Sequence, residues 1–211
     1  MKWIRVTTLL AAALLLTGCL DIVQSVSEEE GDLQSRYRIT VSKSIFHLAE
    51  SFGGYASSVP DAEINQELGL DAEQIGGELP PGLDARVQEI NTRYDVGLDV
   101  TVTSGESESE GAEIWLPRRS AAGLTIPLFP SQEEVSEGTE SSQEADAFLA
   151  GRKYRIIISK SICPPDPTFE FETAEKERQE MAEIIELADV YLIELPLIAW
   201  LEAPGARIVV R

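Results

Sequence analysis

The sequence predicts an α+β fold, in which a mostly antiparallel sheet carries a few helices packed on one side. Segments in which apolar and polar residues alternate outnumber those with helical spacing, and turn-forming residues separate them as they do in hairpins. The few helical segments lie apart from one another along the chain, which is typical of helices that pack on a single sheet. Hydrophobic residues make up 43% of the chain, which is enough for a real core.

The first two strands are expected over residues 20–27 and 36–42, joined by the acidic turn EEEGD. In the second segment Tyr37, Ile39 and Val41 share one face, and this alternation predicts a half-buried strand. Because only a short turn separates the two segments, we expect them to pair as a hairpin.

Four short helices and the clearest strand are expected next. The helices are one that ends at the glycines 53–54, two that begin at Pro60 and at Asp71, and one over residues 83–91. Over residues 94–102, Tyr, Val or Leu alternates with Asp, Gly or Thr, and this alternation predicts the strand. Residues 112–117 are expected to return as its partner.

The middle of the chain holds a strand and a loop. Residues 124–129 read as a strand, but Pro127 has no N–H to donate, which confines the segment to a sheet edge. Residues 130–144 combine acidic residues, Ser, Gly and Pro with almost no apolar side chain. This composition predicts a mobile acidic loop at about 130–144.

The C-terminal part begins with three consecutive isoleucines at 156–158, as expected of a central strand that is covered on both faces. Helical spacing of apolar residues predicts a helix over 173–188. A strand is expected over 189–195, and a last hairpin that turns at 204–205.

The amino terminus has the pattern of an export signal. Lys2 and Arg5 precede an apolar run over residues 6–16, which is too short to span a bilayer. The run ends in the motif Leu-Thr-Gly-Cys at residues 16–19, which resembles the lipobox of bacterial lipoproteins. The resemblance implies a signal peptide over 1–18, cleavage before Cys19 and acylation of Cys19.

The resemblance also implies a location. Residues 19–211 would form a single α+β domain held to the bacterial cell envelope by the lipid on Cys19, because several acyl chains give stable membrane binding. Leu20 follows the lipidated cysteine, and this favours the outer over the inner membrane. With Cys19 acylated, Cys163 has no intramolecular partner, and we expect it to be buried and unreactive.

A near-repeat is the most unusual feature. RYRITVSKSIF at 36–46 and KYRIIISKSIC at 153–163 are identical at seven of eleven positions. The candidate ligand-binding residues are the polar residues of the two Ser-Lys-Ser corners: Ser42, Lys43, Ser44, Ser159, Lys160 and Ser161. If the two corners converge, their ammonium and hydroxyl donors would bind a small anionic ligand such as a phosphate or a lipid head group.

A structural interpretation of the repeat competes with this one, and we favour it. The two segments would be equivalent β-corners at the edge of a pseudo-symmetric sheet. Ile45 and Ile162 would then lie in the core, while Lys43 and Lys160 would be exposed, each near a carboxylate.

The function expected from these features is that of an envelope lipoprotein without enzymatic activity, which binds an envelope protein partner or a small ligand, or assists envelope assembly. The alternative is a hydrolase or transferase with an unfamiliar site of Ser, Lys and carboxylates. Adjacent strand residues point to opposite faces, which disfavours a Ser-Lys dyad and leaves no catalytic residue to assign. We expect no cofactor or metal site, and the net charge of −20 argues against a nucleic-acid partner.

The lipobox generates the first prediction. Cys19→Ser should abolish acylation and move the protein from the membrane to the soluble fraction, because the thiol is the attachment point of the lipid. Fractionation and uptake of labelled fatty acid measure this. Membrane-bound Cys19→Ser protein, together with a wild type that takes up no fatty acid, would show that the motif is not a lipobox.

Overall fold

A computed structural model describes residues 20–44, 72–80, 82–104, 112–121, 123–129, 151–173, 182–201, 203 and 205–211. The fold is mostly β. The described residues form one sheet of seven strands, one sheet of four strands and only two short α-helices.

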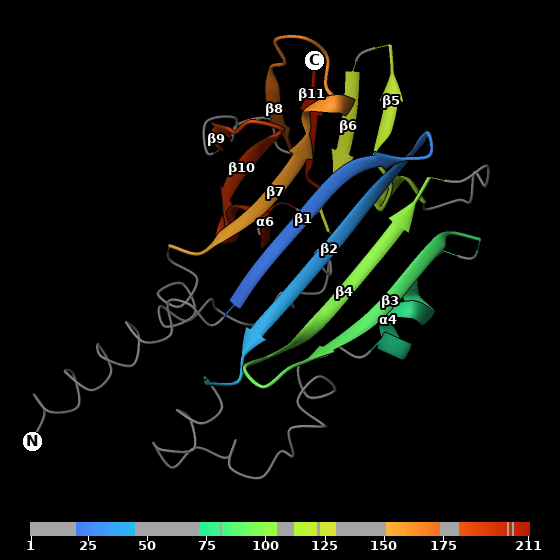
Figure 1. Cartoon of the computed structure of the whole chain (residues 1–211), viewed down its shortest axis with the longest axis vertical. Helices are drawn as coiled ribbons and strands as arrows, with labels where there is room; N and C mark the ends of the chain where they lie inside the picture. The colour runs from blue at the N-terminus through green and yellow to red at the C-terminus, as the bar shows by residue number, and fades with distance from the viewer. Residues whose placement is uncertain are drawn as a thin grey trace, which may run out of the picture.

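The larger sheet has mixed strand directions. In spatial order its strands are β3 (Asp84–Asn91), β4 (Asp95–Thr103), β2 (Asp32–Ser42), β1 (Leu20–Glu29), β7 (Lys153–Ser159), β10 (Val190–Pro196) and β9 (Glu183–Glu186). Figure 1 shows this order face on, with β1 at the centre. All neighbours are antiparallel except β1 and β7, which are parallel. A parallel pair needs a long connection rather than a hairpin, and most of the chain separates these two strands.

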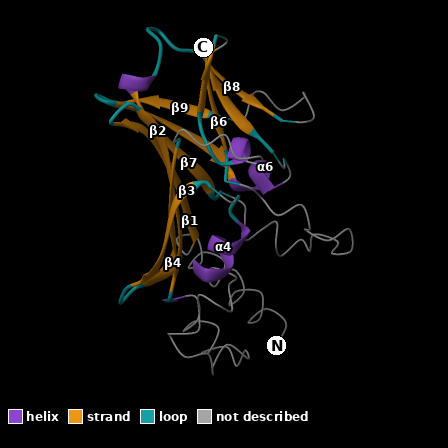
Figure 2. Ribbon diagram, turned by 90° about the vertical axis from the view of Figure 1, so that its right-hand side faces the viewer, coloured by secondary structure: helices purple, strands orange, loops and turns teal. Residues whose placement is uncertain are grey.

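The smaller sheet and the helices cover one face of the larger sheet. The smaller sheet is antiparallel, with the order β5 (Arg118–Ser120), β6 (Gly123–Pro127), β11 (Arg207–Val210) and β8 (Phe169–Glu172). Figure 2 shows this sheet on the same side as the helices α4 (Ala72–Glu78) and α6 (Leu197–Leu201). Two short 3₁₀ turns, η3 (Ala112–Ile114) and η4 (Lys160–Ile162), complete the described elements.

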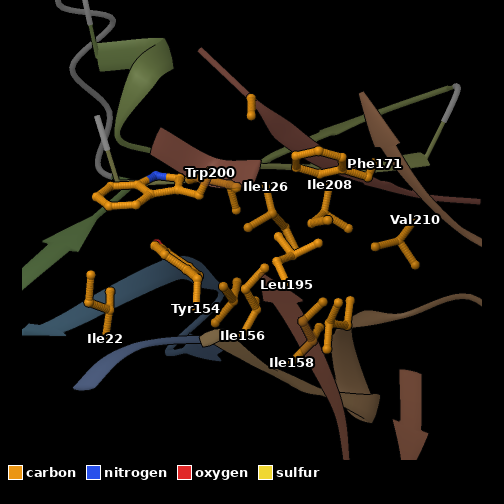
Figure 3. Packing of buried hydrophobic residues seen from close by; sticks show 14 of the residues in the cluster. Ile22, Ile126, Tyr154, Ile156, Ile158, Phe171, Leu195, Trp200, Ile208 and Val210 are labelled. Carbon is orange, nitrogen blue, oxygen red and sulfur yellow. The ribbon is translucent and has the colours of Figure 1, made fainter. Parts of the chain in front are cut away.

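The main core lies between the two sheets. Tyr154 and Ile156 of β7 are fully buried there and face Ile126 and Ile208 of the smaller sheet (Figure 3). A second apolar cluster lies beneath β2 and β4, where Trp115 covers residues that the smaller sheet does not reach. Burial of apolar side chains of this size contributes about 1.5–3 kcal/mol each.

One buried polar group connects the sheets. Gln24 of β1 is fully buried, and its Nε2 donates to the carbonyl of Pro127 at 2.9 Å. Its Oε1 accepts from the hydroxyl of Tyr154 at 2.8 Å, and that hydroxyl in turn accepts from the backbone N–H of Phe129 at 3.0 Å. The amide therefore links β1 and β7 to the end of β6.

The strands predicted from the clearest alternation of apolar and polar residues are confirmed. The strands expected over residues 20–27, 36–42, 94–102 and 189–195 correspond to β1, β2, β4 and β10, and the first two pair as the expected hairpin. The helix expected at Asp71 corresponds to α4.

Several expectations for the weaker segments were wrong. The expected single sheet is two sheets, and the helix expected over residues 83–91 is the strand β3, which pairs along its length with β4. Residues 112–117 do not pair with β4 but contain η3, since β2 and β3 already occupy both edges of β4. Pairing partners, which short-range patterns do not report, decided these elements.

Three expectations for the second half of the chain were also wrong. Pro127 does not place β6 at an edge, because it is the last residue of a strand that lies between β5 and β11. In the region expected to be helical, residues 183–186 form β9, which pairs with β10. The expected last hairpin is instead the helix α6 followed by β11.

Some expectations lie outside the described residues. They are the signal peptide with Cys19, the helix before residues 53–54, the helix at Pro60, Ile45 and the acidic loop at 130–144.

The close approach of β4 and β2 generates the second prediction. A Cβ atom at Gly97 would lie 2.0 Å from the carbonyl oxygen of Ile39, a backbone atom that cannot move without separating the strands. We expect Gly97→Ala to lower the free energy of unfolding by about 1–3 kcal/mol or more. Urea denaturation measures this.

The matched control is Gly76→Ala in α4, where an added Cβ meets nothing within 4 Å. There alanine should leave stability unchanged or raise it by about 0.5–1 kcal/mol. Equal effects at the two glycines would contradict the packing of β4 on β2.

Candidate functional site

The two Ser-Lys-Ser corners have the same local structure. The hydroxyls of Ser42 and Ser44 lie 2.9 Å apart, and those of Ser159 and Ser161 lie 2.8 Å apart. The equivalence extends to the backbone, because each lysine N–H donates to a carbonyl of a neighbouring hairpin. Lys43 bonds to Tyr94 at 2.7 Å and Lys160 to Asp189 at 2.9 Å.

The structure does not bring the two corners together. Val41 pairs with Leu20 at one end of β1, whereas Ile158 pairs with Val26 toward the other end. The serines that follow Val41 and Ile158 therefore lie about 25 Å apart along β1. The six candidate residues cannot converge on one small anion.

The two lysines have different surroundings. Lys160 donates to Glu186 at 2.7 Å, and this hydrogen bond raises the pKa of its ammonium group. The expectation of exposure was wrong for Lys43, which is only 6% exposed, and whose Nζ donates to Asn91 at 2.9 Å. The structural position of Asn91 in its hairpin matches that of Glu186 in the other.

The equivalence covers half of the larger sheet on each side of β1. The strands β2, β4 and β3 correspond to β7, β10 and β9, as Figure 1 shows. Tyr37 pairs with Gln24 and Tyr154 pairs with Ile22, so the pseudo-twofold axis passes near Val23. The repeat therefore marks equivalent β-corners, as we favoured, and Ile162 lies in the core. The corners are not at the sheet edge, because β2 and β7 flank the central strand.

The face of the N-terminal half that no described element covers carries a polar site. A depression of about 380 Å³ is lined by eight polar side chains: Gln34, Arg36, Asp84, Arg86, Gln88, Asp99, Thr101 and Thr103. We call this set the polar depression. Figure 2 shows the larger sheet on edge, with the helices and the smaller sheet on the opposite face.

Strand pairing arranges these residues in rows. Arg36, Thr101 and Arg86 are neighbours across β2, β4 and β3. Rows on one face repeat every two residues, so the depression extends about 14 Å along the strands and about 10 Å across them. The three strands thus form one continuous surface of hydrogen-bonding groups.

One ion pair orders the floor of the depression. Arg36 donates Nε to Asp99 Oδ1 at 2.8 Å and Nη2 to Oδ2 at 2.6 Å, a bidentate arrangement. This hydrogen bonding raises the pKa of the Arg36 guanidinium. Among the described residues, by contrast, the side chains of Arg86, Gln88 and Asp84 make no hydrogen bond or ion pair, so they are available to a ligand.

The equivalent face of the other half has a closed ion network. Glu194 occupies the position that corresponds to Asp99 and accepts from both Lys153 and Arg155, while Arg155 also donates to Asp21 at 2.6 Å. The hydrogen bond from Lys153 lowers the pKa of Glu194. The charged groups of this half therefore satisfy one another.

Sequence reasoning missed the polar depression. Its signal was the polar face of the two clearest strands, which includes Arg36, Asp99 and Thr101. These residues had the appearance of an ordinary solvated strand face, because β3 was expected to be a helix. Only the pairing of β3 with β4 brings Arg86 and Gln88 beside them.

Other possible sites can be assessed within the described residues. No group of three His, Cys, Asp or Glu side chains there could hold a metal ion. No helix in that part of the chain is long and apolar enough to cross a membrane. Cys163 is half-buried and burial raises the pKa of its thiol, which agrees with an unreactive cysteine.

Comparisons with protein-family models, with curated proteins and with solved structures found no match to this chain.

The ion network generates the third prediction. The folded-state pKa of Glu194 lies below its ordinary value of 4.5, so its contribution to stability is complete above pH 4.5 and is lost as the pH falls through the lower folded-state value. The difference in unfolding free energy between wild type and Glu194→Gln should therefore be constant near neutral pH and shrink in acid. Urea denaturation at several pH values measures it.

The control is Asp84→Asn, which removes an exposed carboxylate that makes no ion pair among the described residues. Its stability difference from wild type should change less with pH than that of Glu194→Gln. A Glu194→Gln difference that is independent of pH down to acid unfolding would contradict the network.

Proposed function

We propose that this protein is a lipid-anchored lipoprotein of the bacterial cell envelope, without enzymatic activity, and that it binds a neutral saccharide chain of the envelope through the polar depression. The observation that carries the proposal is the open row of hydrogen-bonding side chains on β2, β4 and β3. The anchor rests on the lipobox at residues 16–19.

The charge of the polar depression favours a neutral ligand. Its lining contains two arginines and two aspartates, so its formal charge is zero in a chain of net charge −20. Arg36 is already paired with Asp99, which leaves Arg86 as the one arginine of the lining without a carboxylate partner among the described residues. An anionic ligand would meet a strongly acidic protein, whereas a neutral ligand would not be repelled.

The residue types favour hydroxyl and amide groups on the ligand. Threonine hydroxyls and glutamine amides both donate and accept hydrogen bonds, and carboxylates and guanidinium groups bind paired hydroxyls. Sugars carry such groups along their whole length. The elongated shape of the depression suits a chain rather than a single small ion.

The position of the depression favours a ligand away from the membrane. Arg36 pairs with Ser25, five residues beyond Leu20, where the chain leaves the proposed anchor. This places the centre of the depression about 17 Å along the sheet from that end. An envelope polymer reaches this level more readily than a lipid head group does.

The fourth prediction tests the binding face. Chitotetraose, a neutral N-acetylated tetrasaccharide, should perturb amide signals of β2, β3 and β4 in an NMR titration and raise the melting temperature, because a ligand that binds only the folded state stabilises it. Arg86→Ala combined with Gln88→Ala should weaken this binding about tenfold or more, since each lost hydrogen bond to a charged group contributes about 1.5–3 kcal/mol.

The matched control is Arg93→Ala, which removes an exposed arginine outside the depression and should leave saccharide binding unchanged. Inorganic phosphate serves as the anionic probe. Binding of phosphate but not of the saccharide, or saccharide binding that survives the double substitution, would contradict the proposal.

A further inference from the structure

The pseudo-twofold axis of the larger sheet produces two equivalent hairpin tips at opposite ends. The β3–β4 turn is closed by the N–H of Thr92 bonded to the carbonyl of Asp95 at 2.8 Å. The β9–β10 turn is closed in the same way, from Leu187 to Val190 at 3.0 Å. We call the first the proximal tip (92–94) and the second the distal tip (187–189).

The two tips have the same backbone but opposite chemistry. In the proximal tip Tyr94 is 66% exposed, and the guanidinium of Arg93 lies 5.3 Å from the centre of its ring. The equivalent positions of the distal tip are Ala188 and Asp189. Since the fold imposes the same turn on both, the aromatic ring and the cation are not required by the turn itself.

The proximal tip lies at the end where the proposed anchor enters. Leu20 pairs with Val41 and Val41 pairs with Val96, so these three residues lie at one level of the sheet. Tyr94 lies two residues further toward the incoming chain, about 7 Å past Leu20, and about 10 Å to the side across two strand spacings. Cys19 is the residue next to Leu20. The tip therefore extends to the level of the anchor or beyond it.

We propose that the proximal tip inserts Tyr94 and Arg93 into the phospholipid head-group region and so fixes the orientation of the domain on the membrane. This rests on the proposed anchoring through Cys19. Tyrosine prefers the membrane interface, where its ring is buried and its hydroxyl stays hydrated. The arginine beside it pairs with lipid phosphates, because a guanidinium binds phosphate oxygens bidentately.

Because the protein is strongly acidic, the side chains at each tip determine which tip can approach an anionic membrane. A chain of net charge −20 is repelled by anionic lipids as a whole. The distal tip with Asp189 would share that repulsion, although it exposes Leu187. The proximal tip is the one of the two that pairs an exposed aromatic ring with a positive charge, so the two tips predict one orientation, with the polar depression held away from the lipid.

The test compares depth at the two equivalent tips. In the acylated full chain with Cys163→Ser, a fluorescent NBD label is attached at Arg93→Cys or at Ala188→Cys, which leaves Tyr94 in place. The protein is reconstituted in vesicles of phosphatidylethanolamine and phosphatidylglycerol with or without a doxyl lipid quencher. We expect a blue shift and loss of most of the fluorescence at position 93, and neither change at position 188.

Further variants and flotation separate the outcomes. Tyr94→Ser in the position-93 protein should reduce both the blue shift and the quenching while the protein still floats with the vesicles. Protein that floats but shows equal quenching at the two tips, or more at position 188, would overturn the inference and leave the anchor intact. Protein that takes up no fatty acid and does not float would overturn the anchor, and this inference with it.

Discussion

The buried amide of Gln24 is the contact on which the rest of the structure depends. It lies on the central strand and bonds to the Tyr154 hydroxyl and the Pro127 carbonyl, which positions β7 and the end of β6 relative to β1. A longer hydrogen bond of 3.4 Å runs from its Nε2 to Ser35 of β2. A buried amide without partners costs about 1–3 kcal/mol, so alternative registers of β7 are disfavoured. Since β2 pairs with the other edge of β1, the same constraint sets the relation between the two halves of the larger sheet.

The two halves share a backbone arrangement but have acquired different surfaces. The half that contains β7 and β10 is covered on one face by the smaller sheet. On its other face, Lys153 and Arg155 both donate hydrogen bonds to Glu194. The half that contains β2 and β4 has a smaller apolar cover around Trp115, and no described element covers its outer face. The two equivalent hairpin tips also differ in their side chains, with Arg93 and Tyr94 at one and Ala188 and Asp189 at the other. Pseudo-symmetry thus gives the two halves matching backbone positions. The side chains at these positions make one outer face a polar depression and the other an ion network.

The errors of sequence interpretation have one cause. The segment 83–91 and residues 183–186 are edge strands that are stabilised by pairing with β4 and β10, and their own residues favour helix about as well as strand. Residues 112–117 alternate like a strand, but both edges of β4, their expected partner, are already paired with β2 and β3. The sequence also could not predict that β7 runs parallel to β1, because apolar and polar residues alternate in the same way in parallel and antiparallel strands. The polar depression was missed for the same reason, since three of its residues, including Arg86, are on β3.

The sequence by itself determined the strongly periodic strands β1, β2, β4 and β10, the first hairpin, the burial of Ile162 and the equivalence of the two Ser-Lys-Ser corners, because short-range patterns of polarity record which side of a strand is buried. Tertiary structure alone decided that these corners lie at opposite ends of β1, that Lys43 is buried, and that Arg36, Thr101 and Arg86 form one row. The physical reason is that register and strand order come from contacts between residues far apart in the chain. No local pattern of polarity contains that information.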